Sequence, residues 1–305
     1  MQPRFSTPAP SADDLLVLLA VSRTGRFTTA ADRLGVNHTT IARRIAALET
    51  ALGGHVLVRG AAGWVLTPLG AQAVEAAEGV ERAVGRVAPS AERRGLTGVI
   101  RLSATDGFSG YVASPAMAAL RRTHPGVSLE IVAVTRQASP QRVGADLEVV
   151  VGRPSVHRAE AIHLADYALG LYASRDLLAR VGVPERVEEL AGAPLVYFID
   201  SMLQVDSLDE ARHSLPEMVD AVSSTNVFVH VEATRAGAGF GLLPAFLADR
   251  EPDLVRVLPE LERRLPYWLV ARPAAFREPA VAAFVEALRE RLAEVRGALL
   301  GQPAG

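Results

Sequence analysis

The chain has 305 residues, 49% of them apolar and 22% charged, and its formal net charge is −2. This composition is typical of a folded protein with two or three domains. The absence of cysteine excludes disulfides, thiolate metal sites and a cysteine nucleophile. Residues 1–12 lack the apolar segment of a signal peptide, and no apolar run reaches the length of a membrane span. We therefore expect a cytoplasmic protein with no membrane partner.

Three helices are predicted at the start of the chain. The first is amphipathic and carries Leu15, Leu18 and Leu19 on one face. Residues 26–50 then have the pattern of a helix-turn-helix, a motif whose second helix reads DNA. The first helix of this motif has an apolar stripe at helical spacing, formed by Phe27, Ala30, Ala31 and Leu34.

The second helix of the motif carries the predicted DNA-reading face. Gly35 permits the left-handed backbone that ends the preceding helix, and Asn37 is a favoured N-cap. The core-facing side consists of Ile41, Ile45 and Leu48. The opposite side has small side chains that allow close approach to a groove, together with one arginine: Thr39, Arg43, Ala46 and Thr50. The alternative is an ordinary surface helix with a solvated arginine.

A β-hairpin is predicted directly after the helices. The runs Val56–Arg59 and Trp64–Thr67 are rich in β-forming residues and flank a tip of glycine and alanine. Three helices followed by a hairpin form a winged helix. Arg59 at the base of the wing can reach a phosphate, or it can simply face solvent.

The charge of this region predicts that it acts in pairs. Residues 1–67 contain seven arginines and four acidic residues, a surplus of +3. Since affinity for DNA rises with the number of neutralised phosphates, so small a surplus favours binding by two copies. Apolar residues of the next segment follow a coiled-coil spacing and predict a dimerisation seam: Leu69, Ala73, Ala76, Val80, Ala83 and Val87. The alternative is a helix packed against its own domain.

Strand and helix patterns alternate from residue 96 onward, which is typical of an α/β domain with a largely parallel sheet. Two α/β lobes with a cleft between them are expected. Ligands bind at the carboxyl ends of strands in such sheets. Polar residues cluster at four of these ends and form the expected effector site: Thr105, Asp106, Phe108 and Ser109; Thr135 and Arg136; Ile199 and Asp200; Ser224, Thr225 and Asn226. Serine, threonine, asparagine and aspartate are also ordinary helix caps.

Both halves of the chain resemble the LysR-type transcriptional regulators. The runs that carry the resemblance are Gly25–Ala31, Leu34–Ile45, Leu57–Arg59 and Leu66–Gly70, followed by Ile100–Thr105, Gly144–Leu147 and Ala236–Pro244. The resemblance implies an α/β protein with an N-terminal winged helix-turn-helix (1–67), a long linker and dimerisation helix (68–95) and an effector domain (96–305). The effector domain of the family is two-lobed, like a periplasmic solute-binding protein; lobe I would span about 96–167 and 266–305, and lobe II about 168–265.

The resemblance also implies the partners. These are double-stranded promoter DNA, a small-molecule effector and further copies of the chain, as a homodimer through the linker helix and a tetramer. The positions that match the DNA-contacting region are Thr28, Asn37, His38, Thr39, Thr40, Arg43, Arg44 and Arg59.

We therefore expect a ligand-responsive transcriptional regulator that is not an enzyme and needs no cofactor or metal. The seven histidines lack metal-ligand spacing, and neither a nucleophile elbow nor a phosphate-binding loop is present. One alternative is an enzyme or solute-binding protein fused to a helical domain. Another is a regulator whose second domain only oligomerises.

Overall fold

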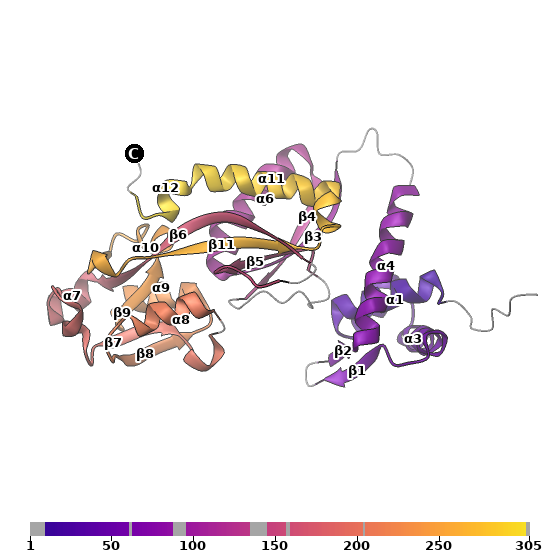
Figure 1. Ribbon diagram of the computed structural model, residues 1–305, viewed down its shortest axis with the longest axis horizontal. Helices are drawn as coiled ribbons and strands as arrows, with labels where there is room; N and C mark the ends of the chain where they lie inside the picture. Colours follow the sequence, from indigo (N-terminus) through magenta and orange to yellow (C-terminus); the bar gives the residue numbers. More distant parts are fainter. Residues whose placement is uncertain are drawn as a thin grey trace, which may run out of the picture. The chain divides into compact units, whose positions relative to one another are not determined.

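A computed structural model describes residues 10–60, 63–87, 96–134, 145–156, 159–203 and 205–302. The chain divides into two compact units, with the division between Arg94 and Gly95 (Figure 1). Each unit has its own hydrophobic core and is described by itself.

The N-terminal unit is a winged helix followed by a long helix. Its elements are α1 (Ala12–Thr24), α2 (Phe27–Leu34), α3 (His38–Leu52), β1 (Leu57–Gly60), β2 (Gly63–Leu66) and α4 (Pro68–Val87). The helices enclose fully buried Leu18, Val21, Ile41 and Leu48. Gly35 takes the predicted left-handed conformation at the end of α2, with φ of 64°. The predicted three helices and hairpin are confirmed, and each strand begins and ends within one residue of its predicted bounds.

Two details of this unit differ from the sequence expectation. Leu34, placed in the apolar stripe of α2, is 41% exposed, because it lies in the last turn, where the chain leaves the core at Gly35. The seam predicted along α4 is wrong in part. Leu69, Ala73 and Val80 pack into the core of their own unit, whereas Ala76 is exposed; the side chains of Ala83 and Val87 lie outside the described residues.

The packing of α4 has a simple cause. Helix α1 offers an apolar face, and small residues of α4 at helical spacing fit closely against it. An ion pair at 2.7 Å between Arg23 of α1 and Glu81 of α4 fixes their alignment. The alternative reading of this helix, packing on its own domain, therefore holds for one face, and a second face with Ala71, Glu75, Ala76 and Val84 is exposed.

The C-terminal unit is built on one mixed sheet in the strand order β4-β3-β5-β11-β6-β9-β7-β8, with β10 paired to β6. The strands are β3 (Thr97–Ala104), β4 (Gly126–Ala133), β5 (Leu147–Val151), β6 (Glu160–Ser174), β7 (Pro194–Phe198), β8 (Val219–Ser224), β9 (Phe240–Pro244), β10 (Leu254–Val257) and β11 (Arg263–Ala271). The α-helices of four or more residues are α6 (Ser114–Thr123), α7 (Arg175–Val181), α8 (Asp206–His213), α9 (Val227–Arg235), α10 (Ala245–Ala248), α11 (Pro279–Glu294) and α12 (Arg296–Leu299); α5 (Asp106–Phe108) and a π-helical turn at Ser109–Ala113 follow β3.

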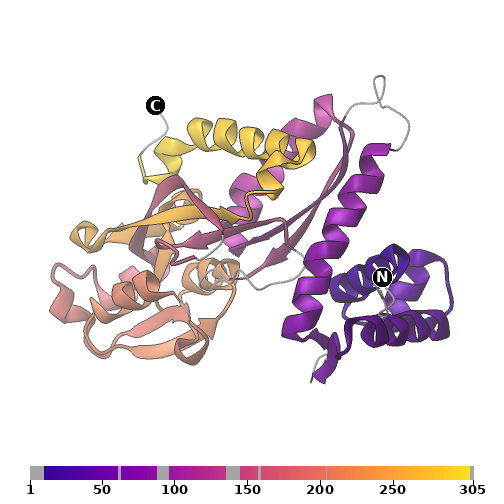
Figure 2. The same cartoon turned by 45° about the vertical axis from the view of Figure 1, so that its right-hand side comes forward.

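Two long strands join the lobes. In lobe I, β3 pairs in parallel with β4 and β5, and α6 and α11 pack against each other on one face of the sheet (Figure 2). In lobe II, β7 pairs in parallel with β8 and β9. Strands β6 and β11 run antiparallel from Arg263–Leu169 to Ala271–Glu160 and take part in both lobes. The lobe boundary expected near residue 167 thus lies inside a continuous strand.

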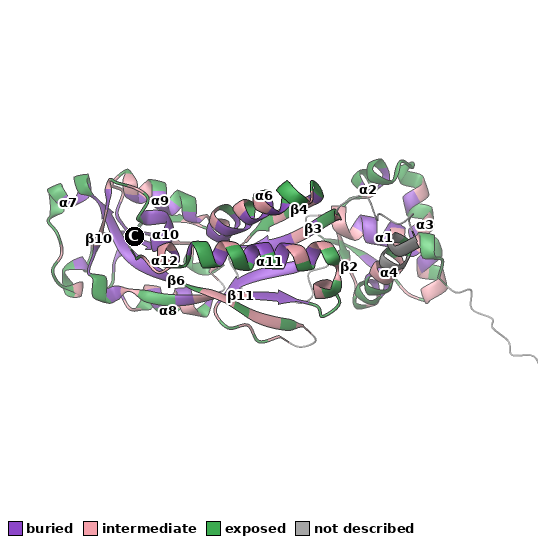
Figure 3. Cartoon of the chain, turned by 90° about the horizontal axis from the view of Figure 1, so that it is seen from above, coloured by how far each residue is buried: buried purple, intermediate pink, exposed green. Residues whose placement is uncertain are grey.

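The core is continuous between the lobes. The largest buried cluster joins residues of lobe I, such as Phe108 and Leu102, to residues of lobe II, such as Leu208 and Phe246. In Figure 3 the second half of β6 is buried, while the outer faces of the helices are exposed. A core shared in this way holds the two lobes together.

Candidate functional site

Helix α3 presents one face to the core of its unit and the other to solvent. Ile41 and Leu48 are fully buried and Ile45 is nearly so. His38, Thr39, Arg43 and Thr50 are exposed, together with Ala42 and Ala46. The Asn37 side chain accepts a hydrogen bond at 3.1 Å from the backbone N–H of Thr39, so the predicted N-cap is formed.

The two neighbouring arginines of α3 have different surroundings. The Arg44 guanidinium lies 3.5 Å from a carboxylate oxygen of Asp13 and 3.3 Å from one of Asp14, both on α1. Arg43 is exposed and forms no ion pair with any residue in the described ranges. The charge of Arg44 is therefore compensated within the unit, and that of Arg43 is directed at solvent.

The wing is anchored to the turn between α1 and α2, an interaction that sequence reasoning missed. The Trp64 ring of β2 stacks on Phe27 of α2, with ring centroids 4.8 Å apart. The backbone N–H of Trp64 donates to the Gly25 carbonyl at 3.1 Å. A Cβ at Gly63 would lie 2.7 Å from the same oxygen, so glycine is required there.

The remaining expected DNA contacts lie in β1, α2 and the first turn of α3. Arg59 in β1 is exposed, opposite Trp64 in the hairpin. Thr28 is exposed in the first turn of α2, and Thr40 is partly buried in the first turn of α3. Anchoring the hairpin on Phe27 fixes Arg59 relative to the helices.

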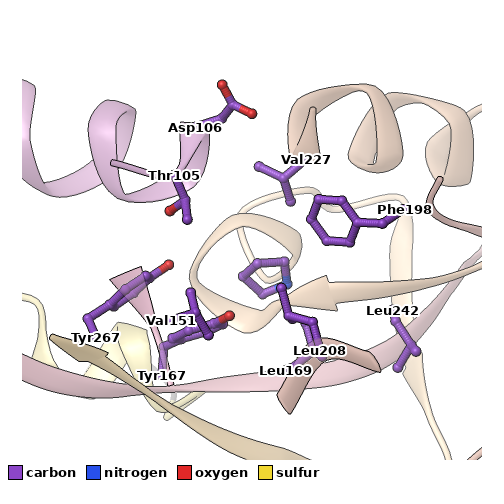
Figure 4. A pocket seen from close by; sticks show the side chains of 12 residues that line it. Thr105, Asp106, Val151, Tyr167, Leu169, Phe198, Leu208, Val227, Leu242 and Tyr267 are labelled. Atoms are coloured by element: carbon purple, nitrogen blue, oxygen red, sulfur yellow. The ribbon is translucent and has the colours of Figure 1, made fainter. Parts of the chain in front are cut away.

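A pocket lies between the two lobes of the C-terminal unit. Its lining comes from both lobes and both joining strands: Thr105, Asp106, Gly107, Val151, Tyr167, Leu169, Phe198, Leu208, Val227, Leu242, Pro244 and Tyr267 (Figure 4). The cavity volume is about 30 Å³, which is room for only one or two water molecules. The pocket is therefore too narrow for a larger molecule in this conformation.

The polar groups of the pocket come from the segment that follows β3. The Thr105 side chain hydrogen-bonds to the Tyr267 hydroxyl, which points toward it. Asp106 is half-buried at the rim beside Val227, and its carboxylate accepts a hydrogen bond from the Val227 N–H at the start of α9. Desolvation raises the pKa of Asp106. The backbone N–H groups of Val227 and of Asp106 itself stabilise the carboxylate and oppose this rise. Burial also raises the pKa of Tyr167 and Tyr267 well above the usual value.

The lobes contact each other at this point through two glycines, and the contact is tight at Gly110. A Cβ at Gly107 would lie 3.5 Å from Val227 and one at Gly110 would lie 3.1 Å from the Phe228 ring. Both glycines belong to the helical segment that follows β3 in lobe I, and both partners belong to α9 in lobe II. The first turn of α9 in lobe II thus packs against these two glycines of lobe I.

Only part of the predicted effector site lines the pocket. Thr105 and Asp106 do so. Phe108 and Ser109 do not, because the helical turn directs them into the core: Phe108 is fully buried edge-on against Tyr267, and Ser109 is 8% exposed. Asp200 is exposed on the turn after β7, and Ile199 precedes it outside the lining. Thr135 and Arg136 lie outside the described residues.

The fourth predicted cluster, Ser224, Thr225 and Asn226, lies at the start of α9. Asn226 caps α9 by accepting from the Phe228 N–H at 2.8 Å, and Ser224 accepts from the Asn226 N–H at 3.1 Å. Thr225 is exposed. None of the three lines the pocket, although Val227 does. These residues orient the helix end, which agrees with the capping alternative.

The residues that were missed are apolar or aromatic and lie within strands or helices. They are Gly107, Val151, Tyr167, Leu169, Phe198, Leu208, Val227, Leu242, Pro244 and Tyr267. Tyr167 and Tyr267 stack across β6 and β11 with centroids 4.5 Å apart. The one available signal was a tyrosine within each of the two strands, Tyr167 in β6 and Tyr267 in β11.

Two other kinds of site are absent from the described ranges. No helix there is both long and apolar enough to span a membrane. No group of three or more histidine, aspartate or glutamate side chains in the same ranges is placed to hold a metal ion.

Comparisons with known proteins agree with this architecture. Residues 12–71 match the family described as bacterial regulatory helix-turn-helix protein, lysR family, and residues 93–293 match the LysR substrate binding domain. The chain is 27% identical over 294 residues to the HTH-type transcriptional regulator DmlR of Escherichia coli (strain K12), covering 93% of this chain and 95% of that protein.

Solved structures show the same fold. ArgP from Mycobacterium tuberculosis superposes with a TM-score of 0.64 at 21% identity, over 96% of this chain and 98% of the other. Full-length CbnR in complex with its target DNA gives a TM-score of 0.55 at 21% identity, over 92% and 99%. The chain therefore belongs to the LysR family of DNA-binding, ligand-responsive transcriptional regulators.

Proposed function

We propose that this regulator reads promoter DNA with the exposed face of α3, chiefly through Thr39 and Arg43, and grips the flanking backbone with Arg59 of the wing. The observation that carries this proposal is the contrast on α3 between Arg43, which has no acidic partner in the described ranges, and Arg44, which is paired with α1. An unpaired guanidinium on a face of small side chains can donate to a guanine edge or a phosphate.

The response to ligand is proposed to come from the pocket between the lobes. Because its volume is only about 30 Å³, an effector enters when the lobes separate around β6 and β11. DNA and effector then change each other's affinity by the same factor, since such coupling is reciprocal. Two copies joined through the exposed face of α4 would pass this change to both winged helices.

The pocket favours binding over catalysis. Its hydroxyls belong to Thr105 and to tyrosines whose pKa is raised, and no base lies beside a nucleophile among the described lining residues. We infer that the protein is not an enzyme and that it acts in the cytoplasm, where promoter DNA is found.

The experiment that tests this function is a titration of the purified chain with the DNA upstream of its own gene at several salt concentrations. We expect binding whose logarithm falls linearly with the logarithm of salt concentration, because each phosphate contact releases counterions. Absence of a complex at low salt would overturn the proposal.

A further inference from the structure

The pocket between the lobes has an unusual distribution of charge. Among the described residues that line it, Asp106 has the one carboxylate, and none of these residues is an arginine, a lysine or a histidine. The remaining lining is aliphatic, aromatic or hydroxyl-bearing. An anionic ligand would therefore meet a like charge, and none of these described lining residues supplies a compensating cation.

Several of the backbone groups that could take a ligand anion are already occupied. At the start of α9, the Val227 N–H donates to Asp106 and the Phe228 N–H donates to Asn226. At the start of the segment after β3, the Phe108 N–H donates to the Thr105 hydroxyl. Helix N-termini are the usual backbone sites for carboxylates, but here the chain's own side chains engage these three N–H groups.

A cationic group would meet favourable partners in the same place. The Asp106 carboxylate is half-buried, and its desolvation makes an opposite charge more stabilising than it would be in water. Tyr167, Phe198 and Tyr267 contribute aromatic rings to the lining, and ring faces attract ammonium groups. The aliphatic walls, Val151, Leu169 and Leu242, favour an apolar body.

From this arrangement we propose that the effector is a small, largely apolar molecule bearing an amine, and that Asp106 selects it. The inference rests on the proposed function of this pocket as the effector site. In the closed state Asp106 bridges lobe I to the Val227 N–H of lobe II. An entering ammonium group replaces the Val227 N–H as the partner of the Asp106 carboxylate. The same residue therefore links the charge of the ligand to separation of the lobes.

The test uses three small probes that share an aromatic ring and differ in charge: benzylamine, benzyl alcohol and benzoate. Calorimetric titration of the full chain should show benzylamine binding at least about ten-fold more tightly than benzoate, since a hydrogen bond to a charged group has this worth. Benzyl alcohol should fall between them. In Asp106→Asn the three affinities should converge to within about three-fold.

The matched control is Asp200→Asn, which removes an exposed carboxylate outside the pocket lining and should keep the benzylamine preference. The proposal is overturned if benzoate binds as well as benzylamine, if the alcohol equals the amine, if no probe binds, or if the preference survives in Asp106→Asn. DNA titration of the same preparations separates the two hypotheses: amine selectivity without DNA binding would contradict the proposed function and leave this inference standing.

Discussion

The exposed face of α3 and the pocket between the lobes differ in how far apart their residues lie in the sequence. The face of α3 comes from consecutive turns of one helix, between His38 and Thr50. The pocket combines residues from Thr105 to Tyr267. Periodicity within one element fixes the first surface, whereas the second exists only after β6 and β11 have brought two lobes together. The two surfaces should therefore fail in different ways when the chain is altered.

The largest effect is expected from removing the buried support of α3. Leu48→Ala creates a cavity in the core of the N-terminal unit and should lower its stability by about 2–5 kcal/mol. Because the C-terminal unit has its own core, its calorimetric transition should not move. Thr50→Ala, on the exposed face of the same helix, is the control. A common shift of both transitions would contradict the separation of the units.

A smaller loss is expected at the anchor of the wing. Trp64→Ala removes the stack on Phe27 and should cost about 2 kcal/mol in the N-terminal unit. It should also weaken DNA binding through Arg59, whose strand pairs with Trp64. Val65→Ala, the next residue and 52% exposed, should change neither the melting temperature nor the affinity. Equal effects of the two variants would show that the stack does not hold the wing.

The third prediction concerns the pH dependence of stability, which should differ between the two units. His230 in α9 is fully buried; desolvation lowers its pKa, while Nε2 lies 2.9 Å from the Ser224 carbonyl oxygen. Below the usual histidine pKa of about 6.5 the unfolded chain takes up a proton that the folded unit resists. Stability of the C-terminal unit should thus fall as the pH is lowered from about 6.5, by at most roughly 1.4 kcal/mol per pH unit.

His230→Gln is the variant that checks this pH dependence. It keeps a donor for the Ser224 carbonyl and removes the titrating group, so the slope of the unfolding free energy between about pH 6.5 and 5 should flatten. The N-terminal unit, whose transition is followed in the same melts, serves as the reference. An unchanged slope in the variant would show that His230 does not carry the effect.

The difference between the surfaces also explains what could be predicted. The cap at Asn37, the glycine turn at Gly35 and the alternating faces of α3 depend on neighbours within a few residues, and the structure confirms them. Pairing of Arg44 with Asp13 and Asp14 spans about thirty residues and carries no periodic signal. The distinction between Arg43 and Arg44 therefore needed the structure.

The pocket was harder to predict because polar residues that follow a strand can either bind a ligand or cap the next helix. Thr105 and Asp106 were identified because they follow β3 directly. Thr105 lines the pocket and also caps a helix, whereas the similar side chains of Ser224 and Asn226 act only in capping. Tyr167 and Tyr267 lie in the middle of long strands, and their meeting depends on the register of β6 and β11. Likewise, the spacing of Leu69, Ala73 and Val80 fits a dimer seam and an intramolecular contact equally well. In the structure these residues pack into the core of their own unit, where α4 lies against α1.

The most direct test of the account compares Arg43→Ala with Arg44→Ala in one DNA titration of the full chain by fluorescence anisotropy. Arg43→Ala should weaken binding about 10- to 100-fold, the worth of one good base or phosphate contact, with an unchanged melting temperature. Arg44→Ala should mainly lower the melting temperature, because it leaves Asp13 and Asp14 unpaired. Equal DNA affinities for Arg43→Ala and the unaltered chain would contradict the assignment of α3 as the reading helix.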